Sequence, residues 1–364
     1  MRVLYGVAGE GMGHATRSRV VLDQLVGEHE VHIVTSGRAR EYLAQHFPHV
    51  HGIWGLTLAY DDNVISRWQT VVQNLRGSIS GWPRNVAEYY RLVEEFEPDV
   101  VITDFEAFAT LFAKRHRLPL ISLDNIQIVD RCAHDPALIE SRDADFWLAR
   151  RIISMKVPRA EHYLVTTFFY PPIRRRRTTL VPPLLRSEIL GAASEPGEHL
   201  LVYQTASGND ALPDVLSQAG VPCRIYGFRR DLNTDVVEGA LTYRPFSEAG
   251  FVDDLRTARA VVAGGGFTLL SEAVYLGKPV LSIPIDGQFE QVLNAVNLEQ
   301  LGYGVHASEA TVDSVGEFLE RLPDCRRALA AYHQDGNEAS MAALRKLLLT
   351  VANGEDSPAE TPTG

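Results

Sequence analysis

The sequence predicts an α/β protein made of two Rossmann-like βαβ domains, and three observations predict it. Short apolar runs rich in β-branched residues alternate with amphipathic stretches, which is the pattern of βα units that feed a parallel sheet. The series of units starts afresh after a Pro- and Arg-rich stretch between residues 170 and 183. The length of 364 residues also fits two domains of ordinary size.

The first domain is predicted over residues 1–185, because six apolar runs there have the length of a buried strand. These runs are Val3–Val7, Val31–Thr35, Val50–Leu56, Val100–Thr103, Leu120–Leu123 and Tyr163–Thr166. Amphipathic segments of helical period follow several of them, so we expect parallel strands joined by helical crossovers.

The second domain is predicted over residues 186–350 on the same grounds. Its strands are expected at Leu200–Tyr203, Arg224–Tyr226, Leu241–Tyr243, Ala260–Ala263, Val280–Ile283 and Gly304–His306. Residues 351–364 are polar and rich in Pro, Thr and Glu. A segment of that composition cannot bury enough apolar surface to fold, so we expect a disordered tail.

Composition and charge exclude several classes of protein. Three scattered cysteines, Cys132, Cys223 and Cys325, give neither a disulfide framework nor a metal-ligand pair. The net charge of −11 argues against nucleic-acid binding, which requires clustered cations. No window approaches the ~20 apolar residues of a transmembrane helix. We therefore expect a cytoplasmic protein.

A glycine-rich loop follows the first strand. Gly9-Glu10-Gly11-Met12-Gly13-His14-Ala15-Thr16-Arg17 leads into an amphipathic helix. Such glycines allow a tight turn, after which helix amides face the carboxyl edge of the sheet. The loop differs from a dinucleotide fingerprint, because the last glycine comes too early and no acidic residue ends the second strand. We therefore expect no nicotinamide or flavin cofactor.

His14 and Asp104 are predicted at the same edge of the first sheet. An imidazole with a pKa near ~6.5 can take a proton from an alcohol or from water at neutral pH. Asp104 ends the strand Val100–Thr103 and is able to orient that imidazole. The alternatives are that His14 caps its helix or lines the cleft, and that Asp104 caps the helix starting near Ala107.

A second motif joins a strand to a helix in the second domain. Gly264-Gly265-Gly266-Phe267-Thr268 places free amides and the positive end of a helix dipole where a diphosphate can bind. Glu272 follows one helical turn later and can accept hydrogen bonds from a ribose diol. Glu290 and Gln291 open the next helix, and their side chains suit sugar hydroxyls, although such residues are also common caps.

The ordered segment from Val262 to Ala295 resembles the donor-binding signature of GT-B glycosyltransferases of the UDP-glycosyltransferase and MurG-like group. Gly9 to His14 resembles the glycine-rich loop and histidine at the N-termini of the same enzymes. The resemblance spans both domains in order, to about residue 350. It implies a GT-B fold, in which two Rossmann-like domains face each other across a cleft with the donor mainly on the second.

The resemblance also implies roles for individual residues. In the second domain, the diphosphate would be held by Gly264, Gly265, Gly266 and Thr268. Glu272 would bind the ribose, and Glu290 and Gln291 would bind the transferred sugar. The nucleobase would be recognised at Phe246, and a further phosphate loop would contain Ser207 and Gly208. In the first domain, His14 would deprotonate the acceptor, Asp104 would orient His14, and Gly11, Gly13 and Arg17 would belong to a phosphate or acceptor loop.

The function implied is inverting, metal-independent transfer of a sugar from a nucleotide-sugar, with UDP favoured by resemblance, to a hydroxyl acceptor. The acceptor can be a small molecule, a glycan or a lipid-linked compound, and no cofactor is expected. Many plant-type members carry histidine where Gly264 stands and tryptophan where Phe267 stands. The loop from Gly11 to Arg17 also resembles that of the UDP-sugar hydrolase of pseudaminic acid synthesis. Hydrolysis or epimerisation of a UDP-sugar is therefore one alternative, and a non-catalytic protein that binds a sugar-nucleotide is the other.

The arginine run Arg174, Arg175, Arg176 and Arg177 follows the aromatic residues Phe168, Phe169 and Tyr170. Four consecutive cations beside aromatic rings can dock against anionic lipid, which would suit a protein peripheral to the inner face of the membrane. The other interpretation is a solvated linker between the two domains. The sequence leaves both open.

Overall fold

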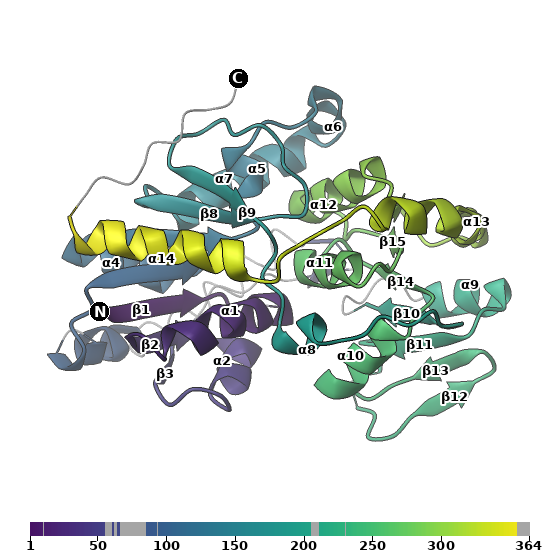
Figure 1. Cartoon of the computed structure of the whole chain (residues 1–364), viewed down its shortest axis with the longest axis horizontal. Helices are drawn as coiled ribbons and strands as arrows, with labels where there is room; N and C mark the ends of the chain where they lie inside the picture. Colours follow the sequence, from purple (N-terminus) through teal and green to yellow (C-terminus); the bar gives the residue numbers. More distant parts are fainter. Residues whose placement is uncertain are drawn as a thin grey trace. The chain divides into compact units, whose positions relative to one another are not determined.

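The computed structural model describes residues 1–9, 11–54, 60–61, 64–65, 85–92, 94–204, 211–229 and 231–354. The chain divides into two compact units. The first is formed by Met1–Ala59, Arg67–Arg186 and Asp335–Gly364, and the second by Tyr60–Ser66 and Ser187–Gln334. Each unit contains one seven-stranded sheet flanked by helices (Figure 1), so the predicted α/β class is confirmed.

All seven strands of the first sheet are parallel. Their spatial order is β3 (Val50–Gly52), β2 (Glu30–Thr35), β1 (Arg2–Val7), β6 (Val100–Asp104), β7 (Leu120–Asp124), β8 (His162–Thr166) and β9 (Thr178–Val181). The central strands β6, β7 and β8 are buried along their whole length, as expected for a parallel sheet covered on both faces. β9 is absent from the sequence prediction because its four residues follow the arginine run directly.

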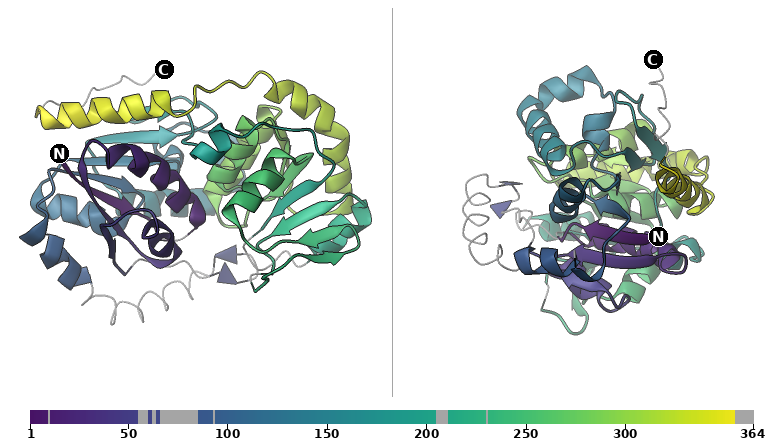
Figure 2. Two further views of the ribbon diagram at one scale, coloured as in Figure 1. Left: turned by 60° about the horizontal axis from the view of Figure 1, so that its bottom comes forward. Right: turned by 90° about the vertical axis from the view of Figure 1, so that its left-hand side faces the viewer.

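The helices of the first unit lie on both faces of this sheet (Figure 2). They are α1 (Met12–Leu25), α2 (Gly37–Leu43), α4 (Ala107–His116), α5 (Ile128–Arg131), α6 (Pro136–Ser141), α7 (Asp143–Lys156) and α14 (Glu338–Ala352), and residues 85–92 are also helical. Side chains of α1, α2 and α14 share one core with Val3, Tyr5 and Val7 of β1. α4 lies on the opposite face, because a Cβ at Gly6 would come within 2.4 Å of Ala109.

The second sheet is parallel except for one edge strand. Its order is β12 (Val236–Glu238), β13 (Leu241–Tyr243), β11 (Cys223–Tyr226), β10 (Leu200–Tyr203), β14 (Ala260–Ala263), β15 (Val280–Ser282) and β16 (Gly304–His306). β12 pairs antiparallel with β13, and the sequence prediction did not include it. The helices of this unit are α8 (Ser187–Leu190), α9 (Leu212–Ala219), α10 (Glu248–Arg256), α11 (Phe267–Tyr275), α12 (Phe289–Gln300) and α13 (Val312–Leu329). A separate antiparallel pair is formed by β4 (Tyr60–Asp61) and β5 (Val64–Ile65).

The C-terminal helix belongs to the first unit, whereas the sequence assigned residues up to 350 to the second domain. α14 packs against β8 and β9 (Figure 1), and its Met341, Leu344 and Leu347 are buried in the first core. Asn337 anchors the start of the helix, because its side chain accepts from the Leu185 N–H at 2.8 Å and donates to the Leu185 carbonyl at 2.6 Å. Helical periodicity identifies a helix but does not say which core it joins.

The arginine run is part of the first unit, so the interpretation of residues 174–177 as a linker between domains is wrong. Arg175 lies 3.0 Å from the Asp130 carboxylate, and Arg174 donates to the Asp130 carbonyl at 3.3 Å. Arg177 lies 3.4 Å from the Glu161 carboxylate. The segment leads directly into β9, and the chain passes from this part of the first unit into the second only after Arg186.

Helices that could cross a membrane are absent from the described residues, since none is both long enough and apolar enough.

Leu344 tests the placement of α14. Truncating a fully buried leucine removes apolar contacts and leaves a cavity, so Leu344→Ala should lower the free energy of unfolding by ~2–5 kcal/mol in chemical denaturation. Leu349, on the same helix, is 65% exposed, and Leu349→Ala should change that free energy by less than ~0.5 kcal/mol. Equal effects of the two variants would contradict the packing described.

Candidate functional site

The turn between β1 and α1 places His14 at the carboxyl edge of the first sheet. Gly11 precedes α1 with a φ of 80°, a conformation that favours glycine. A Cβ at Gly9 would come within 2.0 Å of the Ser36 hydroxyl, so this position also requires glycine. Gly13 lies in the first turn of α1, one residue before His14. The tight turn therefore brings the first turn of α1 directly above the end of β1.

Asp104 lies beside His14, because it is the last residue of β6 and pairs in register with Val7 at the end of β1. His14 Nδ1 lies at hydrogen-bonding distance, 2.8 Å, from Asp104 Oδ1. The aspartate side chain is 1% exposed, whereas His14 is 18% exposed. The two residues therefore meet as the parallel topology predicted, with only the histidine accessible.

Arg17 and Ser18 complete the contacts of the Asp104 carboxylate. Arg17 donates to Oδ1 through Nη2 at 2.6 Å and to Oδ2 through Nε at 3.1 Å. The Ser18 hydroxyl donates to Oδ2 at 3.1 Å. With His14, the carboxylate accepts four hydrogen bonds, which is its full capacity. Arg17 is only 5% exposed, because its guanidinium faces this carboxylate. The sequence prediction assigned Arg17 to a phosphate or acceptor loop, but its side chain points into the protein.

This environment keeps Asp104 ionised. Burial by itself raises the pKa of a carboxyl group, but the charges of Arg17 and His14 lower the pKa of Asp104 overall. The proton shared with His14 therefore stays on Nδ1, which assigns the lone pair of the ring to Nε2. Arg17 Nη2 lies 3.1 Å from His14 Nδ1, and both nitrogens lie within hydrogen-bonding distance of Asp104 Oδ1.

Glu106 is the residue that caps α4. Its carboxylate accepts from the Phe108 N–H at 2.9 Å and from the Ala109 N–H at 2.6 Å. Phe105, between the two acids, has a φ of 56°, so the chain reverses sharply after β6. The alternative role of Asp104 as the cap of this helix is therefore wrong, since Glu106 fills it and leaves Asp104 to face His14.

Asp124 is a second buried carboxyl group that the sequence reasoning missed. It ends β7, the strand next to β6, and its oxygens accept from the Ser122 hydroxyl and the Gln127 N–H, each at 2.8 Å. Burial, and then the charge of Asp104, raises the pKa of Asp124 to about 6. The signal was present in the sequence, because Leu120–Asp124 ends in aspartate as Val100–Asp104 does.

The glycine turn of the second unit leads from β14 into α11. A Cβ at Gly265 would come within 2.2 Å of the Gln291 carbonyl oxygen, so glycine is required where α12 approaches. A Cβ at Gly266 would meet open space. The N-cap residue of α11 is Gly266, which has no side chain to cap the helix, and the first turn, which contains Thr268, holds no acidic residue. Such a helix N-terminus is suited to an anion.

Gln291 holds this turn in place. Its Oε1 accepts from the N–H groups of Gly265 and Ile285, both at 3.1 Å, and its Nε2 donates to Gln288 at 2.5 Å. Gln291 was predicted to bind the transferred sugar, but most of its amide is engaged with the protein itself. Asn294, which sequence reasoning did not select, is fully buried and donates to the Gly265 carbonyl at 3.0 Å.

The other predicted donor residues in the described part of the chain lie in α11, in α12 and after β13. Asn294 also donates to Glu290 at 3.1 Å. Glu272 is only 2% exposed and lies in α11. Phe246 follows β13 and is 65% exposed. Ser207 and Gly208 lie outside the described residues. Across the part of the chain that the structure describes, no three His, Cys, Asp or Glu side chains are grouped to hold a metal ion.

Comparison with known proteins identifies the family from the sequence and a shared fold from the structure. A family model described as glycosyl transferase family 1 matches residues 1–323. An uncharacterized glycosyltransferase of Methanosarcina acetivorans is 24% identical over 358 residues, covering 86% of this chain and 88% of that protein. One of Methanosarcina mazei is 22% identical over 350 residues, with the same coverage.

Solved glycosyltransferase structures share the fold. The calicheamicin glycosyltransferase CalG4 matches with a TM-score of 0.63 at 17% identity, over 98% of this chain and all of that chain. Phytolacca americana UGT2, complexed with UDP-2-fluoro-glucose and pterostilbene, matches with a TM-score of 0.64 at 16% identity, over 97% of this chain and 100% of that chain. The GT-B fold predicted from the sequence is confirmed.

Gly265 and Gly266 form a matched pair for the glycine turn. Gly265→Ala forces a Cβ against the backbone of α12, so we expect a loss of ~1–3 kcal/mol in the free energy of unfolding. Gly266→Ala adds the same atom in open space and should leave that free energy unchanged within ~0.5 kcal/mol. Chemical denaturation of both variants measures the difference, and a Gly265→Ala protein as stable as wild type would refute the close approach.

Asp124 and Asp104 should respond to pH in opposite directions. The pKa of Asp124 lies above its ordinary value of 3.8, so its ionisation lowers stability as pH rises from about 4 to about 6. Asp124→Asn removes this penalty and should gain on the order of 1–3 kcal/mol relative to wild type between pH 4 and pH 7.

The pKa of Asp104 is lowered, so its contribution is present at neutral pH and is lost as acid protonates it. Asp104→Asn should therefore be destabilised most at neutral pH. Denaturation curves at several pH values measure both, and the same pH trend in the two variants would contradict the charge arrangement.

Proposed function

Because the chain belongs to glycosyl transferase family 1, we propose that it transfers a sugar from a UDP-sugar to a hydroxyl acceptor with inversion at the anomeric carbon. The observation that carries this proposal is the hydrogen bond of 2.8 Å between His14 Nδ1 and the buried Asp104 carboxylate. It leaves Nε2 of a partly exposed imidazole free to accept a proton at the carboxyl edge of the first sheet.

In the proposed reaction, His14 Nε2 removes the proton of the acceptor hydroxyl as the hydroxyl oxygen attacks the anomeric carbon. The bond between that carbon and the diphosphate oxygen breaks, and UDP leaves with the electron pair. Asp104 stays ionised and stabilises the imidazolium that forms. A single displacement of this kind inverts the configuration at the anomeric carbon.

The second unit supplies the proposed donor site. The N-terminus of α11, with Gly266 and Thr268, can stabilise the negative charge that develops on the diphosphate. Glu272, one turn further along α11, is the residue we propose to accept hydrogen bonds from a ribose. The presence of UDP-2-fluoro-glucose in the complex of Phytolacca americana UGT2 supports the choice of a UDP-sugar.

We propose that helix amides stabilise the negative charge of the leaving diphosphate, and that the reaction requires neither a metal ion nor a cofactor. Amide N–H groups aimed at a leaving phosphate need no reorganisation during the reaction. Activity that persists unchanged in EDTA would agree with this part of the proposal, and activity restored only by an added divalent cation would refute it.

The acceptor class is a hydroxyl compound, either a small molecule, a glycan or a lipid-linked species. Three of the four arginines at 174–177 are bonded to Asp130 or Glu161 within the first unit. This run therefore gives little support to docking on a membrane, and the acceptor must be identified by assay.

His14→Ala tests the catalytic assignment. We expect turnover to fall by at least ~100-fold, because the base is removed, while the dissociation constant for UDP stays within a factor of about two. Glu272→Ala is the contrasting variant, and should weaken UDP binding by ~1–3 kcal/mol through loss of a charged hydrogen bond. Calorimetric titration with UDP and release of UDP from a panel of UDP-sugars measure the two effects.

The same panel separates transfer from its alternative. UDP release that depends on an added hydroxyl acceptor supports the proposed transferase. Release of free sugar, sugar 1-phosphate or an epimer without acceptor would assign the protein to hydrolysis or epimerisation. A His14→Ala protein that loses UDP binding and turnover equally would contradict the division of roles.

A further inference from the structure

Two segments of the first unit carry many cations and no acidic residue. Residues 107–117, which contain α4, include three Lys or Arg, and residues 146–160, which contain most of α7, include four. Neither segment contains Asp or Glu, although the whole chain has a net charge of −11. Positive charge is therefore concentrated on these two segments of an acidic protein. We call their outer surface the α4–α7 face.

Five of these cations are exposed, and none forms an ion pair with another described residue. They are Lys114, Arg115, Arg117, Arg151 and Arg159. The other two are engaged, because Arg150 binds the Asp130 carboxylate at 2.8 Å and Lys156 lies over the Phe105 ring at 4.2 Å. The five cations thus lack the intramolecular partners that three of the four arginines at 174–177 have.

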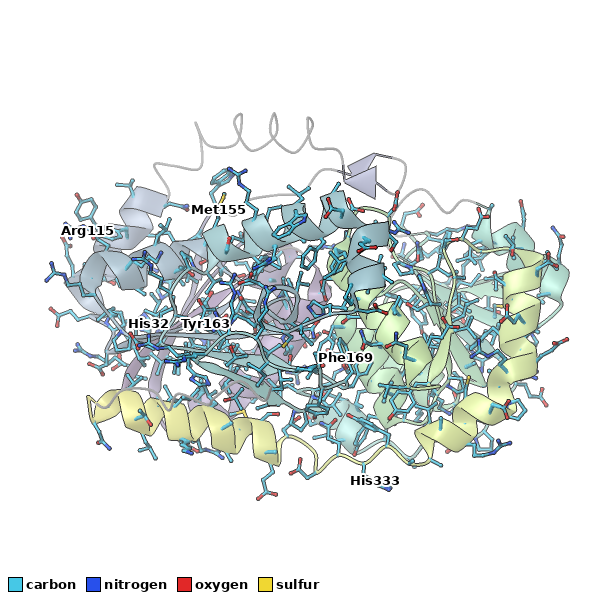
Figure 3. The ribbon with its side chains drawn as sticks, turned by 90° about the horizontal axis from the view of Figure 1, so that it is seen from above. His32, Arg115, Met155, Tyr163, Phe169 and His333 are labelled. Atoms are coloured by element: carbon cyan, nitrogen blue, oxygen red, sulfur yellow. The ribbon has the colours of Figure 1, made fainter. Side chains whose placement is uncertain are left out.

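The two segments are close enough for their charges to interact. Burial, and then the nearby charge of Arg159, lowers the pKa of Lys114. Figure 3 shows Arg115 and Met155 at the outer surface of this unit, with Met155 on the side of the sheet opposite α14. Like charges held together without counter-ions repel, so this face is better suited to an anionic partner than to solvent alone.

Large apolar side chains are exposed among these cations. Met155 is 68% exposed, Leu111 66% and Trp147 53%. Trp147, Arg151 and Met155 are spaced by four residues, so they form one stripe along α7. A stripe that mixes tryptophan, methionine and arginine fits the boundary between lipid headgroups and acyl chains. A nucleic-acid backbone would use the cations but would leave the apolar side chains in water.

We propose that the α4–α7 face docks the protein onto an anionic lipid surface. The cations bind the headgroups, and Trp147, Met155 and Leu111 enter the interfacial layer. The inference does not depend on sugar transfer, since it concerns only the outer surface of the first unit. Combined with His14 in the same unit, it favours an acceptor presented at the membrane.

Vesicle binding by the full chain tests the proposal. The wild-type protein should co-sediment with vesicles that contain phosphatidylglycerol, and much less with vesicles of phosphatidylcholine alone. The triple variant Arg115→Gln, Arg151→Gln and Arg159→Gln should bind the anionic vesicles on the order of 100-fold more weakly. Brominated lipid should quench wild-type tryptophan fluorescence, and the quenching should fall in Trp147→Phe.

The matched control removes the same number of charges from the same unit. The variant Arg175→Gln, Arg176→Gln and Arg177→Gln should bind anionic vesicles as the wild type does. Equal losses in the two triple variants would overturn the assignment to this face, as would wild-type protein that ignores phosphatidylglycerol. Preference for single-stranded DNA over the vesicles would identify a nucleic-acid surface instead. UDP binding, measured separately on each variant, reports on the proposed function independently.

Discussion

The buried ion pair between Asp104 and Arg17 is the interaction on which the site of the first unit depends. It joins the end of β6 to the second turn of α1, and so fixes the rotation of α1 that aims His14. Burying two charges is costly, and the cost is offset here because every acceptor position of the carboxylate is filled. Removing either partner alone would leave a buried charge, at a cost of ~3–5 kcal/mol. After Asp104 the chain reverses at the strained residue Phe105, and Glu106 caps α4. Asp104 is therefore not needed as the cap of that helix.

In the second unit, neutral side chains hold the turn between a strand and the following helix in place. Gln291 and Asn294 bind the backbone of Gly265 from α12, so the glycine turn is fixed by amides rather than by charges. This difference fits the chemistry of the two halves. A general base benefits from a fixed charge beside it, whereas a site for a diphosphate must leave its helix amides uncompensated by any resident anion. Glu272 is buried in α11, and Glu290 accepts a hydrogen bond from Asn294.

The sequence was most informative where one physical rule dominates. Apolar runs located the central strands, and parallel topology alone predicted that His14 and Asp104 share a sheet edge. The sequence was least informative where the direction of a side chain decides which role a residue has. Arg17 stands in a loop motif but turns inward, and Asp104 and Glu106 are two acids of which either could cap α4. Asp124 resembles Asp104 in sequence, yet burial and the charge of Asp104 raise the pKa of Asp124, whereas Arg17 and His14 lower the pKa of Asp104. The placement of α14 depends on which core has an unfilled face, and no local pattern encodes that.

The central claim is that Asp104 and Arg17 together fix the His14 ring with its proton on Nδ1. The most direct test is a long-range proton–nitrogen NMR spectrum of the histidine rings, with His14 assigned by its loss in a His14→Gln variant. At a pH where the ring is neutral, we predict that Nδ1 carries the hydrogen and Nε2 gives the shift of an unprotonated nitrogen. Arg17 Nη2 lies close enough to Nδ1 to donate to it, so the structure could also accommodate the opposite tautomer, with the proton on Nε2. A neutral His14 protonated on Nε2 would contradict the account, because that nitrogen could not act as the base.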